Sequence, residues 1–338
     1  MPVKPSLPAV ALDFTRSQPD DCPTMTRYRI ILNPAADRGA AANMRQPIEH
    51  AFQSRGLAFD LVLTERPGHA IELARSAAAE GCEAVIAAGG DGTANEVLNG
   101  LMRARQAGDG RPPMGVLCVG RGNDFAFGVG IPKELDAACD AIAAGRTRTV
   151  DVGRVIADNT EARYFGNGVG IGFDAVVGFV AARLEHLHGF PAYLVAALKT
   201  IFVYFKAPRV RVEYAGQSKD FLALMVSIMN GRRMGGGFMM APDGDPSDGM
   251  LDLCIAEQVS RLGIFALIPR FMKGTQATRP SISTGRTDCI SVTAIQGTLP
   301  AHADGETLCE AGSKLTIEIL PRQMEVFVPG EMDSEPVR

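Results

Sequence analysis

The residues Gly89, Gly90, Asp91, Gly92 and Thr93 follow a strand-like apolar run and lead directly into a segment with helical spacing. Glycines let a backbone approach a ligand closely, and the free N–H groups at a helix N-terminus favour phosphate. A carboxylate beside an anion needs a cation between them, so Asp91 would face Mg²⁺ directly or through water. The stretch therefore predicts a site for a nucleotide that is bound together with Mg²⁺.

The helix after this turn should be capped by Thr93, with Glu96 three residues later completing a T-x-x-E capping box. Such a helix would begin at the carboxyl edge of a sheet, where α/β proteins bind ligands. The stretch is neither a Walker A loop, because no Gly-Lys-Ser/Thr follows, nor a G-x-G-x-x-G motif. Taken alone, it is more often a tight connection between a strand and a helix that binds nothing.

Strand-like runs alternate with helical segments in the first half of the chain, at residues 28–33, 59–64, 83–88 and 114–119. This alternation is typical of a parallel, doubly wound sheet. Asn123 and Asp124 come just after the fourth run, so we expect them at the same sheet edge as Asp91.

Beyond about residue 150 most segments are strand-like and several alternate apolar with polar residues, which favours an antiparallel sheet. We therefore predict an α/β protein of two domains. Residues 26–148 would form a doubly wound α/β nucleotide-binding domain, and residues 149–318 an antiparallel, sandwich-like β-rich domain. Residues 1–25 would be a disordered lead-in, and residues 319–338 a segment that could pack back on the first domain.

The composition is that of an ordinary globular protein, with 46% hydrophobic residues and a formal net charge of −4. This acidic balance argues against a dedicated nucleic-acid-binding protein. The seven cysteines are scattered and form no C-x-x-C pair, which favours reduced thiols over a zinc site or a disulfide framework. No apolar run is long enough to cross a bilayer. We therefore expect a cytoplasmic protein.

The glycine turn and five further motifs resemble the diacylglycerol kinase catalytic domain family, both in their residues and in their order along the chain. That family includes bacterial lipid kinases and the sphingosine and ceramide kinases. The further motifs are Asn33-Pro34, GRGNDFA at 120–126, GVGIGFDA at 168–175, APDGDPSDGMLDL at 241–253 and HADGE at 302–306. The resemblance covers about residues 27–329, whereas GGDGT alone would also suit NAD kinases and phosphofructokinases.

The resemblance implies a transfer of the γ-phosphoryl group of ATP, bound with Mg²⁺, to the hydroxyl of diacylglycerol or a related lipid alcohol, as in phospholipid biosynthesis. It implies nucleotide contacts from Asn33, Thr64, Gly89, Gly90, Asp91, Gly92, Thr93, Glu96, Arg121, Asn123 and Asp124.

Several of these residues have an ordinary structural alternative. Thr64 could cap the helix expected from Ala70, and Asn123 and Asp124 are common capping and turn residues. Arg121 stands where relatives usually have threonine. Its guanidinium could bind a phosphate in a bidentate manner, or it could be a solvated loop residue.

In the DGE motif, the resemblance implies that Asp304 is the general base acting on the lipid hydroxyl. Glu306 would be its partner or the base itself, and the sequence does not separate the two. The alternative is a hairpin turn with solvated acids, because Asp-Gly is also a hairpin signal.

A second metal site is implied by the resemblance at Asp245, Asp248 and the carbonyl of Met250, in addition to Asp91 at the nucleotide. Oxygen ligands suit a hard cation such as Mg²⁺. The alternative at this place is a polar β-turn.

A lipid acceptor implies peripheral contact with the inner face of a membrane. The segment 190–211 places Phe202 and Phe205 near Lys199 and Lys206, a combination that suits an anionic surface. The alternative is a core helix followed by a strand. The glycine- and methionine-rich loop 231–242 is a second candidate for lipid contact.

The resemblance also implies a possible homodimer. Two other functions remain open. One is a small-molecule kinase like the NAD kinases. The DGE motif and the Asp245–Met250 segment argue against it. The other is a non-catalytic regulator that binds lipid or nucleotide on the same fold, which the departure at Arg121 keeps open.

Overall fold

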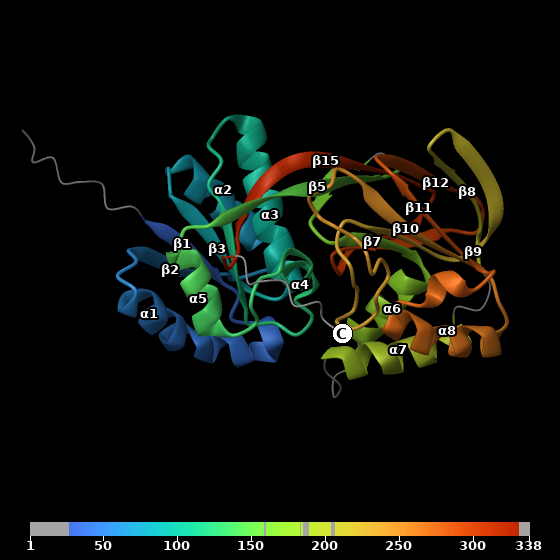
Figure 1. Cartoon of the computed structure of the whole chain (residues 1–338), viewed down its shortest axis with the longest axis horizontal. Helices are drawn as coiled ribbons and strands as arrows, with labels where there is room; N and C mark the ends of the chain where they lie inside the picture. The colour runs from blue at the N-terminus through green and yellow to red at the C-terminus, as the bar shows by residue number, and fades with distance from the viewer. Residues whose placement is uncertain (1–26, 159, 183, 185–188, 204–206, 331–338) are drawn as a thin grey trace, which may run out of the picture.

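The computed structural model describes residues 27–330 except 159, 183, 185–188 and 204–206, and shows two domains side by side (Figure 1). The predicted lead-in at 1–25 and the end of the predicted C-terminal segment, 331–338, lie outside the described residues. So do Phe205 and Lys206 of the predicted membrane segment.

The N-terminal domain contains a parallel sheet in the order β4-β3-β1-β2. Its strands are β1 (Tyr28–Leu32), β2 (Phe59–Leu63), β3 (Ala84–Gly89) and β4 (Met114–Cys118). Its helical segments are η1 (Ala36–Met44), α1 (Arg45–Ser54), α2 (His69–Ala79), α3 (Asp91–Ala107), α4 (Asp124–Val129) and α5 (Leu135–Ala143). Helices α2 and α3 pack on one face of the sheet, and α1 and α5 on the other. The predicted doubly wound arrangement is confirmed.

The C-terminal domain is built from antiparallel strands around a second core. The strands are β5 (Thr147–Ala157), β6 (Arg163–Phe165), β7 (Gly168–Gly172), β8 (Arg209–Tyr214), β9 (Gln217–Met229), β10 (Leu251–Glu257), β11 (Ile282–Thr287), β12 (Cys289–Gln296), β13 (Leu299–Ala303), β14 (Glu306–Gly312) and β15 (Lys314–Phe327). The predicted β-rich second domain is confirmed.

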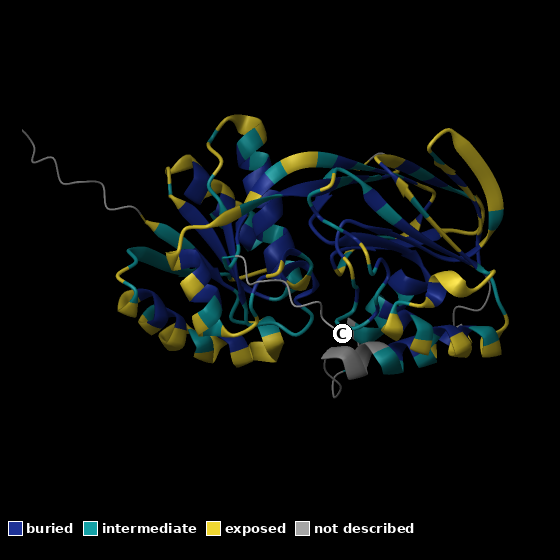
Figure 2. Ribbon diagram, in the orientation of Figure 1, coloured by how far each residue is buried: buried dark blue, intermediate teal, exposed yellow. Residues whose placement is uncertain are grey.

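Helices α6 (Phe173–Ala182), α7 (Gly189–Val203) and α8 (Arg261–Lys273) form a separate layer over one side of this domain, with the short η2 (Gln276–Thr278) after α8 (Figure 1). Their inward-facing apolar residues form a third core cluster with β9 and β10. Figure 2 shows the buried positions along the strands and the exposed ones on the outer sides of the helices. Over the described residues, no helix combines the length and apolar character needed to cross a bilayer.

The long strand β15 connects the two domains. It pairs antiparallel with β5 from Leu315 to Phe327, with an irregularity between Leu320 and Met324. Near its end, Val326 pairs in parallel with Met114 of β4. A sheet therefore continues from one domain into the other and holds the end of β3 near the β13–β14 turn.

Candidate active site

The glycine turn joins β3 to α3 in a way that differs from the predicted capping. Gly90 is the extended N-cap residue and α3 begins at Asp91, so Thr93 lies within the first helical turn. The prediction of Thr93 as the cap is therefore wrong. The Thr93 hydroxyl instead accepts a hydrogen bond from Asn33 Nδ2 at 3.0 Å, which ties the β1 and β3 ends together.

Glycine is required here by close packing. A Cβ on Gly89 would lie 2.3 Å from the Thr93 hydroxyl oxygen, and a Cβ on Gly120 would lie 2.2 Å from the Gly90 Cα. Two backbone segments that follow neighbouring strands can therefore touch only because neither carries a side chain.

Glu96 caps a different helix from the one predicted. Its Oε1 accepts from the backbone N–H of Gly68 at 2.8 Å, and its Oε2 from that of Ala70 at 3.1 Å. The carboxylate therefore satisfies donors at the N-terminus of α2, where negative charge is favourable. The predicted capping box is thus replaced by a contact between α3 and α2.

An open, polar cavity of about 560 Å³ lies at the carboxyl edge of the parallel sheet. Among the predicted nucleotide-binding residues, those that line it are Asn33, Thr64, Gly90, Gly92, Thr93, Glu96 and Arg121. Arg121 forms an ion pair with Asp37, which also lines the cavity. Glu306 reaches the same cavity from the C-terminal domain. Predicted contacts from both domains therefore meet in one cavity.

Asp91 does not line this cavity. Its Oδ1 accepts from the backbone N–H groups of Asp124 at 2.7 Å and Phe125 at 3.2 Å, which caps α4. A Cβ on Gly122 would lie 2.4 Å from Oδ2, so glycine is needed beside this carboxylate. Burial, reinforced by the charge of Asp124, raises the pKa of Asp91 to about 7. The role of Asp91 in this structure is to join the GGDGT and GRGND motifs.

Asp124 and Asn123 likewise lie outside the cavity lining. The Asp124 carboxylate accepts from Arg233 Nε at 2.8 Å and from the Gly236 N–H. Burial raises its pKa, while Gly236 and Arg233 oppose that shift. Asn123 has a positive φ of 54° and donates to the Gly120 carbonyl. Asp124 thus holds the 231–242 loop of the second domain against the first domain.

The two acids of the DGE motif occupy different places. Asp304 is buried, and its carboxylate accepts from Asn95 Nδ2 and from the backbone N–H groups of Gly166, Asn167 and Gly168, at 2.8 to 3.0 Å. Burial raises its pKa and these donors oppose the shift. A carboxylate has about four acceptor positions, so Asp304 has no evident position left for another donor.

Glu306 faces the cavity. Its Oε1 would lie 2.5 Å from a Cβ placed on Gly92, so it stands directly beside the glycine turn. Burial, with a contribution from Glu96, raises the pKa of the Glu306 carboxyl, and Arg163 at 3.9 Å opposes the shift. A second polar cavity of about 420 Å³ shares Glu306 and Glu96 and is also lined by Arg163 and Arg103. Glu306 therefore lies between two cavities.

The predicted second metal site lies in the loop between β9 and β10. Asp245 pairs with Arg148 and accepts from Ser247, whereas Asp248 pairs with Arg286. The charge of each carboxylate is thus already balanced by a separate guanidinium, which does not fit a shared Mg²⁺ ligand set with Met250. The metal site stays a prediction.

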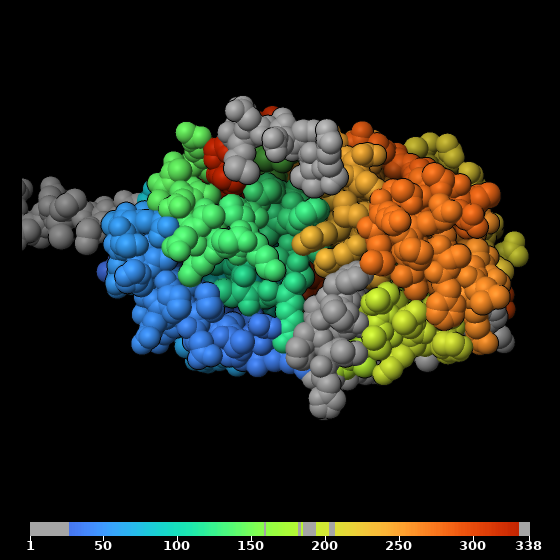
Figure 3. Space-filling model, turned by 60° about the horizontal axis from the view of Figure 1, so that its bottom comes forward, coloured from blue at the N-terminus to red at the C-terminus, as the bar shows by residue number. Residues whose placement is uncertain are grey.

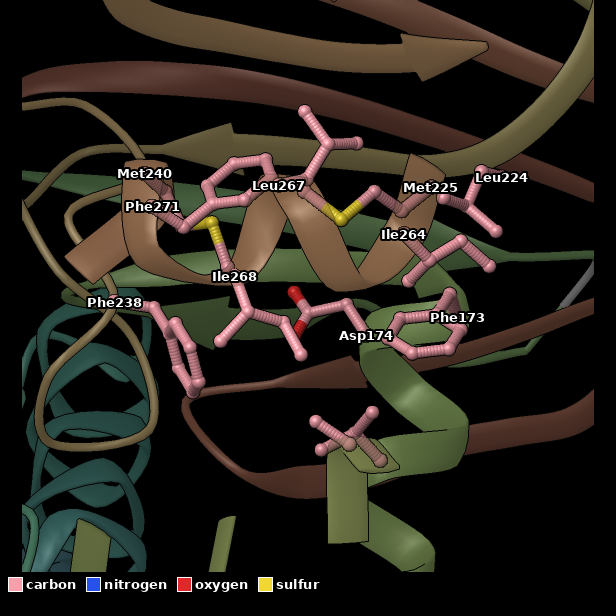
Figure 4. A pocket seen from close by; sticks show the side chains of 12 residues that line it. Phe173, Asp174, Leu224, Met225, Phe238, Met240, Ile264, Leu267, Ile268 and Phe271 are labelled. Carbon is pink, nitrogen blue, oxygen red and sulfur yellow. The ribbon is translucent and has the colours of Figure 1, made fainter. Parts of the chain in front are cut away.

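A narrow apolar pocket of about 50 Å³ lies beneath the helical layer of the C-terminal domain (Figure 4). Its lining is apolar except for one acid and consists of Phe173, Asp174, Val177, Ala197, Leu224, Met225, Phe238, Met240, Ile264, Leu267, Ile268 and Phe271. Phe238 and Met240 come from the glycine- and methionine-rich loop. Figure 4 shows the Asp174 carboxylate between Ile268 and Phe173.

Two buried polar side chains, Asp174 and His302, lie between this pocket and the DGE turn without a hydrogen bond between them. His302 Nε2 lies 3.8 Å from Asp174 Oδ2, and His302 Nδ1 accepts from the Gly305 N–H at 3.2 Å. A Cβ on Gly170 would lie within 2.5 Å of both side chains, so only glycine leaves room for them. His302 lies on β13 and Asp304 in the turn that follows, so no strand periodicity in the sequence indicates the contact between His302 and Asp174.

The comparisons with known proteins agree with this geometry. The diacylglycerol kinase catalytic domain family matches residues 27–155, and the YegS C-terminal NAD kinase beta sandwich-like domain family matches residues 167–328. A diacylglycerol kinase from Mycobacterium tuberculosis is 30% identical over 301 residues, which cover 88% of this chain and 94% of the relative. The chain belongs to the diacylglycerol kinase family. This membership makes it a kinase.

Further relatives support the same assignment. A diacylglycerol kinase from Bacillus subtilis is 30% identical over 313 residues, covering 91% of this chain and 98% of the relative. A crystal structure of a Bacillus anthracis protein has the same fold, with a TM-score of 0.71 and 23% identity over 90% of this chain and 98% of that one. Both domains of the family are therefore present in one chain.

Proposed function

We propose that the protein transfers the γ-phosphoryl group of ATP to the hydroxyl of diacylglycerol or a related lipid alcohol. The observation that carries this proposal is the cavity of about 560 Å³ that Glu306 shares with Gly90, Gly92 and Thr93. The N-terminus of α3 from one domain and an acid from the other thus line the same cavity.

The donor side fits a nucleotide. The N-terminus of α3 lies at the cavity, and a helix N-terminus favours phosphate. Arg121 also lines the cavity, and its guanidinium would have to leave Asp37 to bind a phosphate. Mg²⁺ would arrive with ATP and neutralise charge on the transferring group. The predicted ligand Asp91 lies outside the cavity lining and its Oδ1 caps α4, so the ion would be held chiefly by the phosphate oxygens of ATP.

Glu306 is the proposed base in this reaction. It takes the proton of the lipid hydroxyl while the hydroxyl oxygen forms the bond to the γ-phosphorus and ADP leaves. Its raised pKa brings it closer to the operating pH, which favours proton acceptance. Asp304 would instead fix the turn that carries Glu306, since its carboxylate already accepts four hydrogen bonds.

The apolar pocket supports a lipid acceptor. Methionine side chains adapt readily to a flexible occupant, and Met225 and Met240 both line it. A volume of about 50 Å³ is too small for most of an acyl chain, so we expect the pocket to widen when a lipid enters.

The test is a transfer assay with labelled ATP, Mg²⁺ and a panel of acceptors: diacylglycerol, monoacylglycerol, sphingoid bases, ceramide, phosphatidylglycerol and NAD. We expect a labelled phospholipid. Glu306→Gln should reduce turnover about 10²–10⁴-fold, the usual range for general-base catalysis. Glu310→Gln, an exposed acid on the same strand, should retain full activity. Label in NAD alone, or in no acceptor, would overturn the proposal.

A further inference from the structure

Helix α8 presents apolar residues on the side that faces away from the protein. Its inner side buries Ile264 and Phe271, as expected for a surface helix. On the outer side, however, Leu262 is 79% exposed, Met272 42% and Phe265 38%. A helix that meets only water normally carries polar residues on that side, so α8 is built to face something other than water.

The apolar surface continues onto α7. Phe202 is 64% exposed, and its ring centroid lies 6.5 Å from that of Phe265. We call Phe202, Leu262, Phe265 and Met272 the α7–α8 face. Figure 3 brings this side of the molecule forward, with α7 in yellow-green next to α8 in orange.

The charged residues on these two helices are all positive. Helix α8 carries Arg261, Arg270 and Lys273, and α7 carries Lys199, whereas neither helix contains an acidic residue. The two helices are therefore basic, whereas the chain as a whole has a net charge of −4. Exposed apolar side chains flanked by cations match an anionic phospholipid surface, in which the apolar groups insert and the cations meet headgroups.

The α7–α8 face lies on the opposite side of helix α8 from the apolar pocket. Ile264, Leu267 and Phe271 on the inner side of α8 line that pocket (Figure 4). A membrane seated on the outer side would therefore be separated from the pocket by a single helix.

We infer that the α7–α8 face docks the protein on an anionic phospholipid bilayer. Docking places α8 at the interface, so that a lipid acceptor can pass from the bilayer into the pocket behind it. The use as an acceptor entrance rests on the proposed lipid kinase function, whereas the docking itself can be measured without ATP or turnover.

The experiment is co-sedimentation of the full chain with two kinds of vesicle: phosphatidylcholine alone, and phosphatidylcholine mixed with phosphatidylglycerol. We expect the protein to sediment with the mixed vesicles and to be released by salt. Leu262→Glu should weaken binding at least about ten-fold, because a large apolar side chain no longer inserts. Lys273→Gln should weaken it about five-fold.

The matched control is Ile295→Glu. Ile295 is 47% exposed on β12, outside the helical layer, so the variant should bind vesicles like the wild type. Melting temperatures of all variants check the fold, and Leu262→Gln replaces Leu262→Glu if that variant is unstable. Absence of vesicle binding by the wild type, or unchanged binding by the Leu262 variant, overturns the inference.

Two further readouts separate the remaining outcomes. If the Leu262 variant converts a dimer into a monomer by light scattering while vesicle binding is unchanged, the face joins two copies of the chain and the inference is wrong. If docking behaves as expected but no acceptor in detergent micelles is phosphorylated, the docking surface stands and the proposed function fails.

Discussion

At the residue scale, the acids of the site are distinguished by their partners. Asp304 is enclosed by four N–H donors, whereas Glu306 faces the cavity beside Gly92. The residue that connects this turn to the apolar pocket is His302. Because His302 Nδ1 accepts from the Gly305 N–H, the neutral ring carries its proton on Nε2, which faces Asp174.

Substitution of His302 tests this connection. In His302→Asn, the side-chain oxygen can still accept from Gly305, so we expect kcat to be largely retained while KM for the lipid rises. In His302→Leu the turn loses a hydrogen bond worth about 1 kcal/mol, so kcat should fall as well. Steady-state kinetics with ATP and the lipid varied separately measure both effects. Identical kinetics for the two variants would exclude a positioning role for the Gly305 hydrogen bond.

At the element scale, a carboxylate from α3 caps the N-terminus of each of the helices α2 and α4. Glu96 caps α2, and Asp91 caps α4. The three helix ends are thus fixed relative to one another around the cavity edge. This arrangement explains why Asp91 and Glu96 stand in the glycine-turn motif even though neither caps α3.

The pKa of Asp91 makes the stability of this arrangement dependent on pH. Burial raises that pKa from 3.8 to about 7 in the folded protein. The folded state therefore binds this proton more tightly than the unfolded state does. The resulting contribution to the free energy of unfolding is fully present below about pH 4 and is lost as the pH rises through about 7. Asp91→Asn keeps an oxygen that can cap α4 but does not ionise.

We therefore expect Asp91→Asn, without nucleotide, to melt at a higher temperature than the wild type above about pH 7, with a difference that shrinks toward about pH 4. Thermal melts across this range measure it. Asp136→Asn, an exposed acid on α5, should show no such trend. A constant difference at all pH values would contradict the assignment.

At the scale of the whole molecule, β15 joins the two domains because it pairs with β5 of one domain and with β4 of the other. Asp151 braces its irregular segment: Oδ1 accepts from the Arg322 N–H and Oδ2 from the Gly249 N–H, both at 2.7 Å. Asp151 is fully buried. One side chain therefore fixes both the connecting strand and the end of the 245–250 loop.

Asp151→Ala should remove the two hydrogen bonds from Gly249 and Arg322 to a buried carboxylate, at a cost of about 1.5–3 kcal/mol each in the free energy of unfolding. Asp151→Asn retains one acceptor and should lose less. Urea denaturation followed by circular dichroism measures the free energies. We expect the wild type to unfold in a single transition because the sheet spans both domains; two separate wild-type transitions would show that β15 does not couple them.

The sequence by itself determined the two-domain α/β architecture, the glycine turn and the family, because these depend on local periodicity and on motifs of a few residues. Tertiary structure decided which acid faces the cavity and which helix each carboxylate caps. It also decided that His302 meets Asp174 and that the outer side of α8 is apolar and exposed. These features depend on segments that are distant in sequence, such as Asn95 and Asp304, and no local pattern specifies how such side chains meet.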